Sequence, residues 1–316
     1  MPSVENTDDS DTIVSLQDVQ EAQQAISNNI VETPFLHSRR LSELTGATIY
    51  LKFENRQFTG AFKERGALNK LLSLSEEQRK IGVITVSAGN HAQGVAFHAN
   101  RLGIPSVVVM PVHTPHVKVH RTASFGAEVL LHGEDFDEAK KYALRIMEER
   151  GLVFVHPYDD AKVIAGQGTI ALEMLAAQPD LDAVIVPVGG GGLISGIGTV
   201  MKALRPEMDV VGAQTQRFPS MYQALSGILP RPSSRSDSSS DSLDETRDTV
   251  CANNVGCSTI ADGIAVRQPG ALTLRIVEKL GCDVLLVDEG DIEDAMLILL
   301  EVEKTLVEGC PSLYRA

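Results

Sequence analysis

The stretch "AVIVPVGGGGLISGIG", residues 183–198, decides the fold class of this chain. Its first six residues are apolar and mostly β-branched, which predicts a buried strand. Four consecutive glycines follow, and the apolar residues after them predict the start of a helix. A strand that turns directly into a helix is the repeating unit of α/β folds with parallel sheets.

Similar strand and helix patterns alternate from residue 48 onward. The predicted strands are ATIYLKF (47–53), GVITVS (82–87), SVVVM (106–110), AEVLLH (127–132), LVFVH (152–156), DAVIVPV (182–188), DVVGA (209–213) and DVLLV (283–287). The clearest helix has Asp135 as its N-cap, Glu138 three residues later and Gly151 as its stop signal. We therefore expect an α/β protein with mainly parallel sheets and helices on both faces.

The composition indicates a globular protein with a sizeable core. The 316 residues are 43% hydrophobic and 22% charged, and such a length suits roughly two domains. A net charge of −14, with 4% aromatic residues and no Trp, argues against binding to a nucleic acid. No apolar run is long enough to span a membrane, so a membrane is not an expected partner.

The cysteine pattern and the N-terminal residues bear on location. Cys251, Cys257, Cys282 and Cys310 lack the spacing of a metal or redox motif, and we interpret them as reduced thiols. No Lys or Arg precedes Arg39, so a secretory or mitochondrial leader is not expected. These features predict a cytoplasmic protein.

The glycines Gly189, Gly190, Gly191 and Gly192 predict a phosphate-binding loop. Consecutive glycines let the backbone approach an anion, and the N–H groups of the first helical turn point at it. A tight strand-to-helix turn is the alternative, although such a turn needs fewer glycines. The sequence "GQGTIA", residues 166–171, matches a loose dinucleotide-binding pattern but does not follow a strong strand, so a dehydrogenase is not favoured.

The stretch "VSAGNHAQGVAFHA", residues 86–99, predicts a second strand-to-helix transition. Ser87, Ala88, Gly89 and Asn90 lie at the N-terminus of this helix, where free N–H groups and the helix dipole favour a carboxylate. The Asn90 side chain either donates a hydrogen bond into the same space or simply caps the helix. Sequence position alone leaves both interpretations open.

The stretch "QFTGAFKERGAL", residues 57–68, predicts a short helix with Lys63 opposite its apolar stripe. By spacing alone Lys63 is a solvated lysine, and the alternative is a lysine held toward a reacting group. In "HTPHVKVH", His116 and His120 lie four residues apart on a helix that Pro115 begins. No third ligand has a useful spacing, so a surface helix is favoured over a metal site, and no metal is expected.

Three further segments have distinct compositions. Residues 231–248 contain seven serines and almost no apolar residues, which predicts a disordered surface insertion. Residues 1–12 are polar and acidic, which predicts a frayed terminus. The segment "LILLEVEKTLVEG", residues 297–309, predicts a helix.

The motifs FKERGA, SAGNHAQG and GGGGL, in this order, resemble those of the fold type II pyridoxal-phosphate enzymes. The segments MPVHTPHVKVHRTASFGAEV and TIADGIAV are typical of the threonine dehydratase branch, which also contains serine dehydratases and serine racemase. The resemblance covers roughly residues 15–230 and 255–309. It implies two doubly wound parallel-sheet domains with the cofactor between them: a large domain of residues 1–81 and 160–316, and a small domain of residues 82–159.

The resemblance also implies a role for each matched residue. Lys63 is expected to hold pyridoxal 5'-phosphate as a Schiff base, and Asn90 to hydrogen-bond the phenolic oxygen of its ring. The groups expected to bind the phosphate are the backbone N–H groups of Gly189, Gly190, Gly191, Gly192 and Leu193. The residues expected around the substrate carboxylate are Ser87, Ala88, Gly89, Asn90 and His91.

The implied activity is β-elimination of L-threonine, and of L-serine, to a 2-oxo acid and ammonia. The chain is then a lyase of amino-acid metabolism, for example of isoleucine biosynthesis, with a small amino acid as substrate and a homo-oligomeric state, dimer or tetramer. Serine racemase is a less favoured alternative. Ala88 stands where such racemases carry a second serine, and Gln214 stands where they carry the first acid of a metal site.

The sequence departs from the family pattern after residue 309. Family members continue from the VEG motif into a strand that presents Ser, Thr or Cys to the pyridine nitrogen, whereas this sequence reads CPSLYRA. A catalytically impaired chain, which only binds ligand or pairs with other subunits, is therefore the alternative function.

Overall fold

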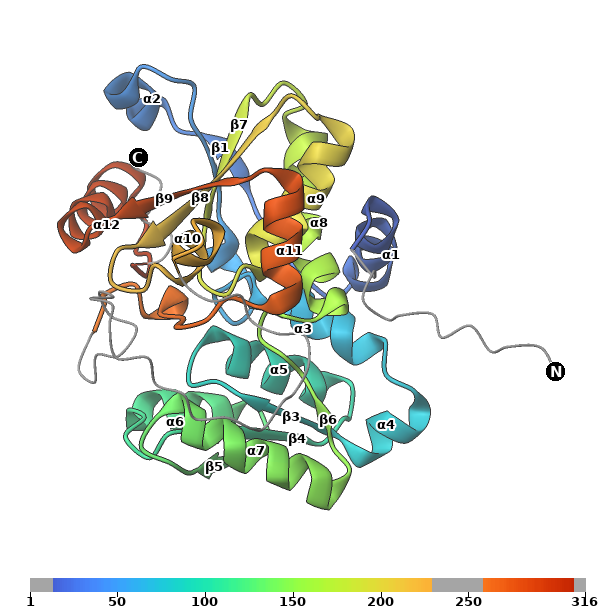
Figure 1. Ribbon diagram of the computed structural model, residues 1–316. Coiled ribbons are helices and arrows are strands. Elements are labelled where there is room, and N and C mark those ends of the chain that lie inside the picture. Colours follow the sequence, from blue (N-terminus) through green and yellow to red (C-terminus); the bar gives the residue numbers. More distant parts are fainter. Residues whose placement is uncertain (1–13, 229–257, 310–316) are drawn as a thin grey trace.

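The structure, a computed structural model, describes residues 14–228 and 258–309. Figure 1 shows one parallel sheet with its helices in the lower half and a second parallel sheet in the upper half, with helix α3 (Lys63–Leu72) between them. None of the described helices is long and apolar enough to cross a membrane. The serine-rich segment, residues 1–12 and the cysteines at 251, 257 and 310 lie outside the described residues.

The lower sheet contains four parallel strands in the order β5-β4-β3-β6. They are β3 (Val83–Val86), β4 (Ser106–Met110), β5 (Glu128–Leu131) and β6 (Val153–Phe154). Alternate side chains of β4 pack on opposite faces, Val108 and Met110 against α5 (Asn90–Arg101) and Val107 and Val109 against α7 (Phe136–Arg150). Because both faces are covered, "SVVVM" is apolar throughout instead of alternating.

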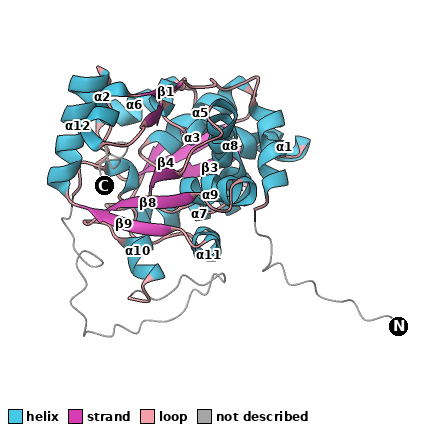
Figure 2. Ribbon diagram, turned by 90° about the horizontal axis from the view of Figure 1, so that it is seen from above, coloured by secondary structure: helices cyan, strands magenta, loops and turns pink. Residues whose placement is uncertain are grey.

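The upper sheet contains three parallel strands in the order β7-β8-β9. They are β7 (Ala183–Pro187), β8 (Asp209–Thr215) and β9 (Asp283–Val287). Helices α8 (Ala161–Ala177), α9 (Gly192–Leu204) and α11 (Ala271–Leu280) share one apolar core with these strands and with α1 (Leu16–Ile26). Figure 2 shows β8 and β9 lying among these helices, and the two parallel sheets together confirm the predicted α/β class.

The predicted strand at residues 47–53 forms β2 (Tyr50–Lys52), but it belongs to neither parallel sheet. It pairs antiparallel with β1 (Phe35–His37), a three-residue strand that is too short to carry a pattern in the sequence. The remaining helices are α2 (Arg39–Thr45), α4 (Glu76–Ile81), α6 (His116–Ser124), α10 (Ser220–Leu225) and α12 (Glu289–Glu303), with short 3₁₀ turns η2 (Glu54–Arg56) and η3 (Asp262–Ile264).

The helix signals were confirmed at α7 and overestimated at α12. The Asp135 side chain accepts the Glu138 N–H at the start of α7, and Gly151 ends this helix in the left-handed conformation. By contrast, the prediction of a helix through residue 309 is wrong after Glu303. Lys304 adopts a φ of 53°, and the Thr305 N–H bonds back to the Leu299 carbonyl, which closes the helix.

Helix α3 is buried on nearly all sides, which its sequence did not predict. It lies between α5 and α8, and its buried side chains include the polar residues Glu64, Arg65 and Asn69. Gly66 permits the close approach of α8, because a Cβ at this position would lie 2.7 Å from the Val163 carbonyl oxygen. The polar residues of α3 are therefore parts of the interior and need partners there.

Arg65 is the centre of a buried charge network. Its guanidinium, with no exposed surface, donates two hydrogen bonds of 2.8 Å to Glu54, and it also bonds to Glu173 and to Thr169. Lys52 adds a second cation beside Glu173. Burial alone lowers the pKa of Arg65, but the two carboxylates outweigh it and hold that pKa above its usual value. The network thus balances two cations against two anions.

Replacing Arg65 by methionine should unfold the chain at a lower urea concentration. The change leaves two carboxylates without their shared cation, and loss of one partner from a buried network costs about 3–5 kcal/mol. Arg39→Met is the control, because Arg39 pairs with Glu43 on the surface and its side chain is 85% exposed. Equal urea midpoints for the two variants would contradict the proposed contribution of the network to stability.

Candidate active site

Three loops that follow parallel strands meet between the two sheets. Residues 87–91 follow β3, residues 155–159 follow β6 and residues 188–193 follow β7. The His91 Nε2 atom lies 3.1 Å from the Val155 carbonyl oxygen, and the ring of Tyr158 packs on Gly190. Ligands of open α/β sheets bind beyond the carboxyl ends of the strands, which is where these loops lie.

Lys63 points into this meeting place. It is the first residue of α3, and its half-buried side chain donates a hydrogen bond of 2.8 Å from Nζ to the Pro157 carbonyl oxygen. The start of α3 lies directly against α5, since a Cβ on Gly94 would come within 3.4 Å of the Lys63 carbonyl carbon. The lysine is thus held toward the loop after β6 and does not extend into solvent.

The N-terminus of α5 is open toward the same space. Gly89 is its N-cap residue and Asn90 is its first residue, so the interpretation of Asn90 as a capping side chain does not hold. The Asn90 Nδ2 group instead donates a hydrogen bond of 2.8 Å to Glu308. A Cβ built on Gly89 would meet no atom of the described residues within 4 Å, and Ser87 and Ala88 are half-buried beside it. The helix end therefore offers N–H groups to a small anion.

His91 is buried and neutral. Burial, with the positive charge of Lys63, lowers the pKa of His91 to about 3. Because the Val155 carbonyl can only accept, the Nε2 atom carries the proton. The Nδ1 atom has no hydrogen-bond partner among the described residues. This imidazole therefore presents an unsatisfied acceptor in the interior beside Lys63.

The glycine loop meets the loop after β6, whose Tyr158 ring lies against Gly190. Gly191 has a φ of 96°, a conformation that favours glycine, and side chains at Gly190 and Gly191 would overlap Tyr158 and Met221. The Gly190 carbonyl accepts hydrogen bonds from Thr273 Oγ1 (2.6 Å) and the Gly270 N–H (3.2 Å). Helix α9 starts at Gly192 without a side-chain cap, so its first N–H groups lack intrahelical partners.

The loop after β6 was missed by the sequence analysis, although it touches every part of the site. Its carbonyl oxygens at Val155 and Pro157 accept from His91 and Lys63, and its Tyr158 ring covers Gly190. The His156 Nδ1 atom accepts the N–H groups of Tyr158 (3.3 Å) and Asp159 (2.8 Å). Burial lowers the pKa of His156 to about 4, so the ring remains an acceptor near neutral pH.

Asp159 ties this loop to the upper sheet. Its carboxylate accepts the N–H groups of Ala271, Leu272 and Thr273, at 2.9–3.1 Å, at the start of α11. Thr273 in turn holds the Gly190 carbonyl. A signal for this loop existed in the sequence, because the stretch "PYDD", residues 157–160, directly follows the predicted strand at residues 152–156.

The two sequence patterns that we did not favour, the dinucleotide-binding pattern and the histidine pair, lie in helices α8 and α6. The "GQGTIA" segment lies inside α8, where Gly166 allows close packing on α3 and forms no turn. His116 and His120 lie on α6, with Pro115 as its N-cap residue. Within residues 14–228 and 258–309, no group of three or more His, Cys, Asp or Glu side chains is arranged to hold a metal ion.

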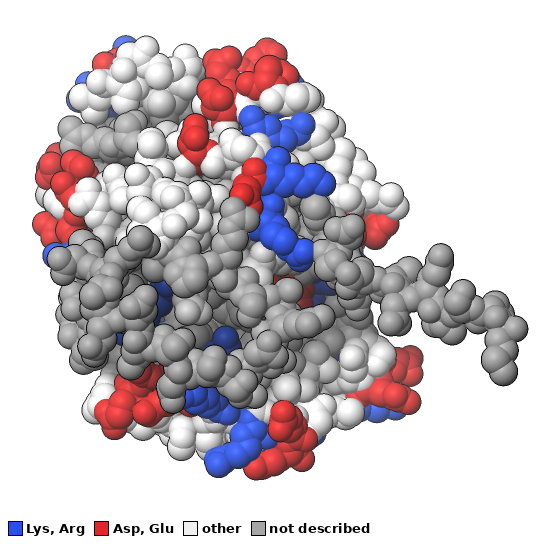
Figure 3. Space-filling view, viewed as in Figure 1, with Lys and Arg blue, Asp and Glu red and all other residues white. Residues whose placement is uncertain are grey.

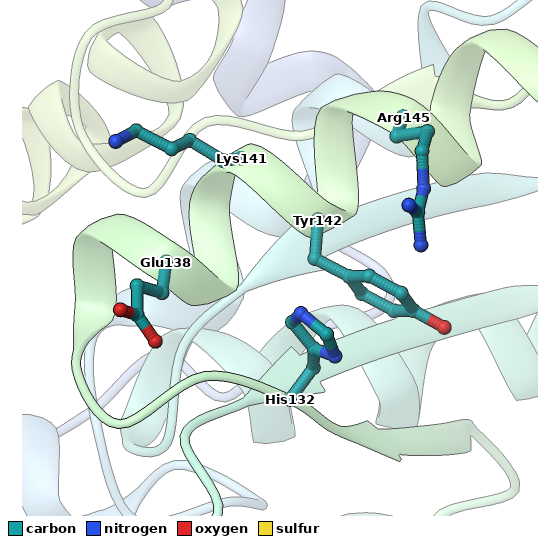
Figure 4. A pocket seen from close by; sticks show the side chains of 5 residues that line it. All are labelled: His132, Glu138, Lys141, Tyr142 and Arg145. Atoms are coloured by element: carbon teal, nitrogen blue, oxygen red, sulfur yellow. The ribbon is translucent and has the colours of Figure 1, made fainter.

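A second, shallower pocket lies outside the site. Figure 4 shows a shallow pocket on α7, where the rings of His132 and Tyr142 stack at 3.9 Å and Arg145 lies over the tyrosine. On the face drawn in Figure 3, acidic and basic side chains are interspersed.

The fold and the site together define a class of α/β protein in which a partly buried lysine faces a glycine loop and a helix N-terminus. The chain belongs to the pyridoxal-phosphate-dependent enzyme family, whose model matches residues 26–312. This membership confirms the resemblance inferred from the three motifs, and it confirms pyridoxal phosphate as the cofactor.

The chain is similar to characterised members of this family. It is 47% identical, over 94% of its length and 69% of the relative's, to L-threonine ammonia-lyase of Thermotoga maritima. Among solved structures, serine racemase from Dictyostelium discoideum matches with a TM-score of 0.81 and 35% identity, covering 95% of this chain and 89% of that one. Threonine deaminase isoform 2 from Solanum lycopersicum matches with a TM-score of 0.82 and 32% identity, covering 96% and 79%.

The described residues fit the cofactor that the family uses. The loop at residues 189–192 has no room for a Cβ at Gly190 or Gly191 and presents the open N-terminus of α9, which suits a phosphate. The Lys63 amine, held by the Pro157 carbonyl one residue before Tyr158, would anchor the aldehyde of the cofactor. Tyr158 lies beside both, and burial raises the pKa of its hydroxyl group, so it stays neutral.

The pH dependence of the unfolding free energy between pH 7 and pH 4 should show that His91 is buried in its neutral form. Its pKa is about 3 in the folded chain and about 6.5 in an unfolded chain, so between these values only the unfolded state binds the proton. The unfolding free energy therefore falls with decreasing pH by about 1.4 kcal/mol per unit from this residue. His91→Gln should lose this contribution, and an unchanged slope would show that His91 titrates normally.

Gly190→Ala should weaken cofactor binding by about 10-fold or more, because overpacking against Tyr158 costs about 1–3 kcal/mol. Absorbance titration with pyridoxal phosphate measures the effect. Gly290→Ala, in the first turn of α12, is the matched control, since its added Cβ meets only Asp288 at an ordinary 3.4 Å. Wild-type affinity in Gly190→Ala would contradict the tight contact.

Proposed function

We propose that this chain is a pyridoxal-phosphate-dependent ammonia-lyase that converts L-threonine, and L-serine, to a 2-oxo acid and ammonia. The observation that carries the proposal is the hydrogen bond from Lys63 Nζ to the Pro157 carbonyl, which holds the amine against the loop whose Tyr158 packs on the glycine loop. The relatives named threonine ammonia-lyase and threonine deaminase support the same reaction.

Different groups of this chain bind the cofactor phosphate, the cofactor ring and the substrate carboxylate. The N–H groups of Gly189, Gly190, Gly191, Gly192 and Leu193 bind the cofactor phosphate at the start of α9. The open end of α5, residues 87–91, binds the carboxylate of the amino acid. Asn90 donates to the cofactor ring oxygen, and its bond to Glu308 fixes the orientation of the amide.

Lys63 moves the proton. When bound, pyridoxal phosphate makes the substrate Cα–H acidic by delocalising the electron pair that the proton leaves behind. The Lys63 amine would anchor the cofactor, and as a free amine it would remove the substrate Cα proton as a general base. The Pro157 carbonyl orients the amine in either protonation state, because it accepts an N–H from both.

Two side chains favour elimination over racemisation. Reprotonation from the opposite face needs a proton donor, and Ala88 supplies only a methyl group. Gln214, at the position of the racemase metal ligand, is a buried amide whose Oε1 atom accepts the Tyr222 N–H. An amide used in this way is a poor substitute for a carboxylate that binds a divalent cation.

The proposal also covers the domain boundaries, the oligomeric state and the location of the protein. The lower sheet, residues 83–154, lies within the predicted small domain of residues 82–159, and we assign residues 1–81 and 160–316 to the large domain. We further propose a homo-oligomer in the cytoplasm, as expected for an enzyme of amino-acid metabolism.

Lys63→Ala should give a colourless protein after incubation with pyridoxal phosphate. Release of 2-oxobutanoate from L-threonine should fall by about 100- to 10,000-fold, because the general base is removed together with the cofactor anchor. Absorbance spectra and a keto-acid assay measure the two effects.

Lys70→Ala is the matched control, since Lys70 lies on the same helix but pairs with Asp160. It should keep both colour and turnover. Wild-type protein that binds cofactor without releasing product would favour the catalytically impaired alternative. Wild-type protein that folds but binds no cofactor would overturn the proposal.

A further inference from the structure

Helix α11 begins without a capping side chain from its own segment. Its N-cap residue is Gly270, and the first N–H groups of a helix need acceptors from outside the helix. The acceptor here is the Asp159 carboxylate in the loop after β6, whose hydrogen bonds of 2.9–3.1 Å come from the N–H groups of Ala271, Leu272 and Thr273. A Cβ on Gly270 would overlap this carboxylate. A loop of the lower sheet therefore caps a helix of the upper sheet.

The capped turn of α11 holds one carbonyl group of the glycine loop. The Gly190 carbonyl oxygen accepts the Thr273 hydroxyl at 2.6 Å and the Gly270 N–H at 3.2 Å. The buried Thr273 hydroxyl lies farther, 3.1 Å, from the Gly270 carbonyl oxygen, so the bond to Gly190 is the shorter one. Because both donors belong to the turn that Asp159 caps, this carboxylate fixes their positions.

The bound carbonyl selects one of two orientations of the peptide group between Gly190 and Gly191. A peptide group between two glycines can turn over at little steric cost, because glycine tolerates backbone angles that other residues avoid. In this trans peptide the C=O and the N–H point in opposite directions. With the carbonyl held by α11, the Gly191 N–H points away from α11, and no described residue accepts it. In the reversed orientation an oxygen would point there, and the loop would lose a donor for an anion.

Asp159 also leaves only one of two helix ends open beside the glycine loop. Helices α9 and α11 both start next to this loop, and the N-terminus of either helix favours an anion. The Asp159 carboxylate occupies the N-terminus of α11, whereas α9 starts at Gly192 without a side-chain cap. A phosphate therefore finds its donors at Gly191 and the start of α9.

The loop that carries Asp159 also holds the lysine. Pro157, two residues earlier, accepts the hydrogen bond of 2.8 Å from Lys63 Nζ. Residues 157–159 thus set both the amine for the cofactor aldehyde and, through α11, the glycine loop for the cofactor phosphate.

We propose that Asp159 is a positioning residue for the phosphate-binding loop. By capping α11 it places the Thr273 hydroxyl and the Gly270 N–H against the Gly190 carbonyl, and this orients the Gly191 N–H toward the cofactor phosphate. The inference rests on the proposed placement of the phosphate at residues 189–193, but it does not depend on which reaction follows. Acting through α11, Asp159 thereby favours the phosphorylated cofactor over its unphosphorylated form.

The test compares the dissociation constants of pyridoxal 5'-phosphate and of pyridoxal, which lacks the phosphate. They are measured by absorbance titration of the full chain after removal of cofactor. Asp159→Ala removes the cap, and Thr273→Val removes the hydroxyl while keeping the shape of the side chain. Both variants should bind pyridoxal 5'-phosphate about 10-fold or more weakly, because a hydrogen bond to a charged group is lost. Their affinity for pyridoxal should equal that of the wild type.

Two control variants remove the same chemical groups elsewhere. Asp135→Ala is matched to Asp159→Ala, because Asp135 accepts the Glu138 N–H as the N-cap of α7, outside the site. Thr122→Val is matched to Thr273→Val, since the buried Thr122 hydroxyl donates to the Lys118 carbonyl within α6. Both controls should keep the wild-type ratio of the two dissociation constants.

A double variant tests whether the two residues act in series. If Asp159 acts through Thr273, adding Thr273→Val to Asp159→Ala should cause no further loss of affinity for pyridoxal 5'-phosphate. Additive losses would overturn the proposal. So would equal weakening of both ligands in Asp159→Ala, which would indicate a purely structural role, or a wild type that binds both ligands equally.

Two further outcomes separate this inference from folding and from the proposed reaction. If Asp159→Ala does not fold, Thr273→Val provides the same comparison of the two ligands, and an unchanged ratio in that variant would overturn the proposal. The expected pattern of dissociation constants in a wild type that releases no 2-oxo acid would support the positioning role and contradict the proposed reaction.

Discussion

The hydrogen bond from the Lys63 amine to the Pro157 carbonyl depends on a loop that is itself fixed at three points. His91 bonds to the loop at Val155, the loop's Tyr158 lies on the glycine turn, and its Asp159 accepts three N–H groups at the start of α11. These contacts join the lower sheet to the upper one. The site is therefore positioned by main-chain groups and one carboxylate, which vary little in geometry.

The buried polar side chains of α3, beneath this loop, are likewise held by specific partners. Helix α3 carries Lys63 at its start and then Glu64 and Arg65, whose side chains have no exposed surface. Glu64 accepts from His98 and from the Thr59 backbone, while Arg65 is clamped by Glu54 and Glu173. Such groups are tolerated inside a protein only when they are fully paired, so α3 can occupy one orientation alone. The fixed orientation of α3 also fixes the position of Lys63, its first residue.

The sequence was most informative where a residue type has one physical use. Four glycines after an apolar strand predicted the loop before α9, and the apolar runs located the strands of both parallel sheets. Motif resemblance placed Lys63, which spacing alone would have left on a solvated face. The burial of Glu64 and Arg65 was not predictable, because their partners His98 on α5 and Glu173 on α8 lie far away in the sequence. The loop at residues 155–159 was missed because two of its contacts use carbonyl oxygens, which have no signature in a sequence; only the polar residues after the strand at 152–156 marked its position.

The glycines between helices have a consequence for motion. A Cβ on Gly66 would collide with α8, one on Gly166 would lie 2.7 Å from the Gly66 Cα, and Gly94 lies against the first turn of α3. Backbones in such close contact cannot slide past one another without losing that fit. The Cα atom of Lys63 is therefore fixed in position, and its amine can move only by rotation about the bonds of its four methylene groups. Any closing of the two halves around a substrate must then be a movement of the rest of the molecule toward the lysine.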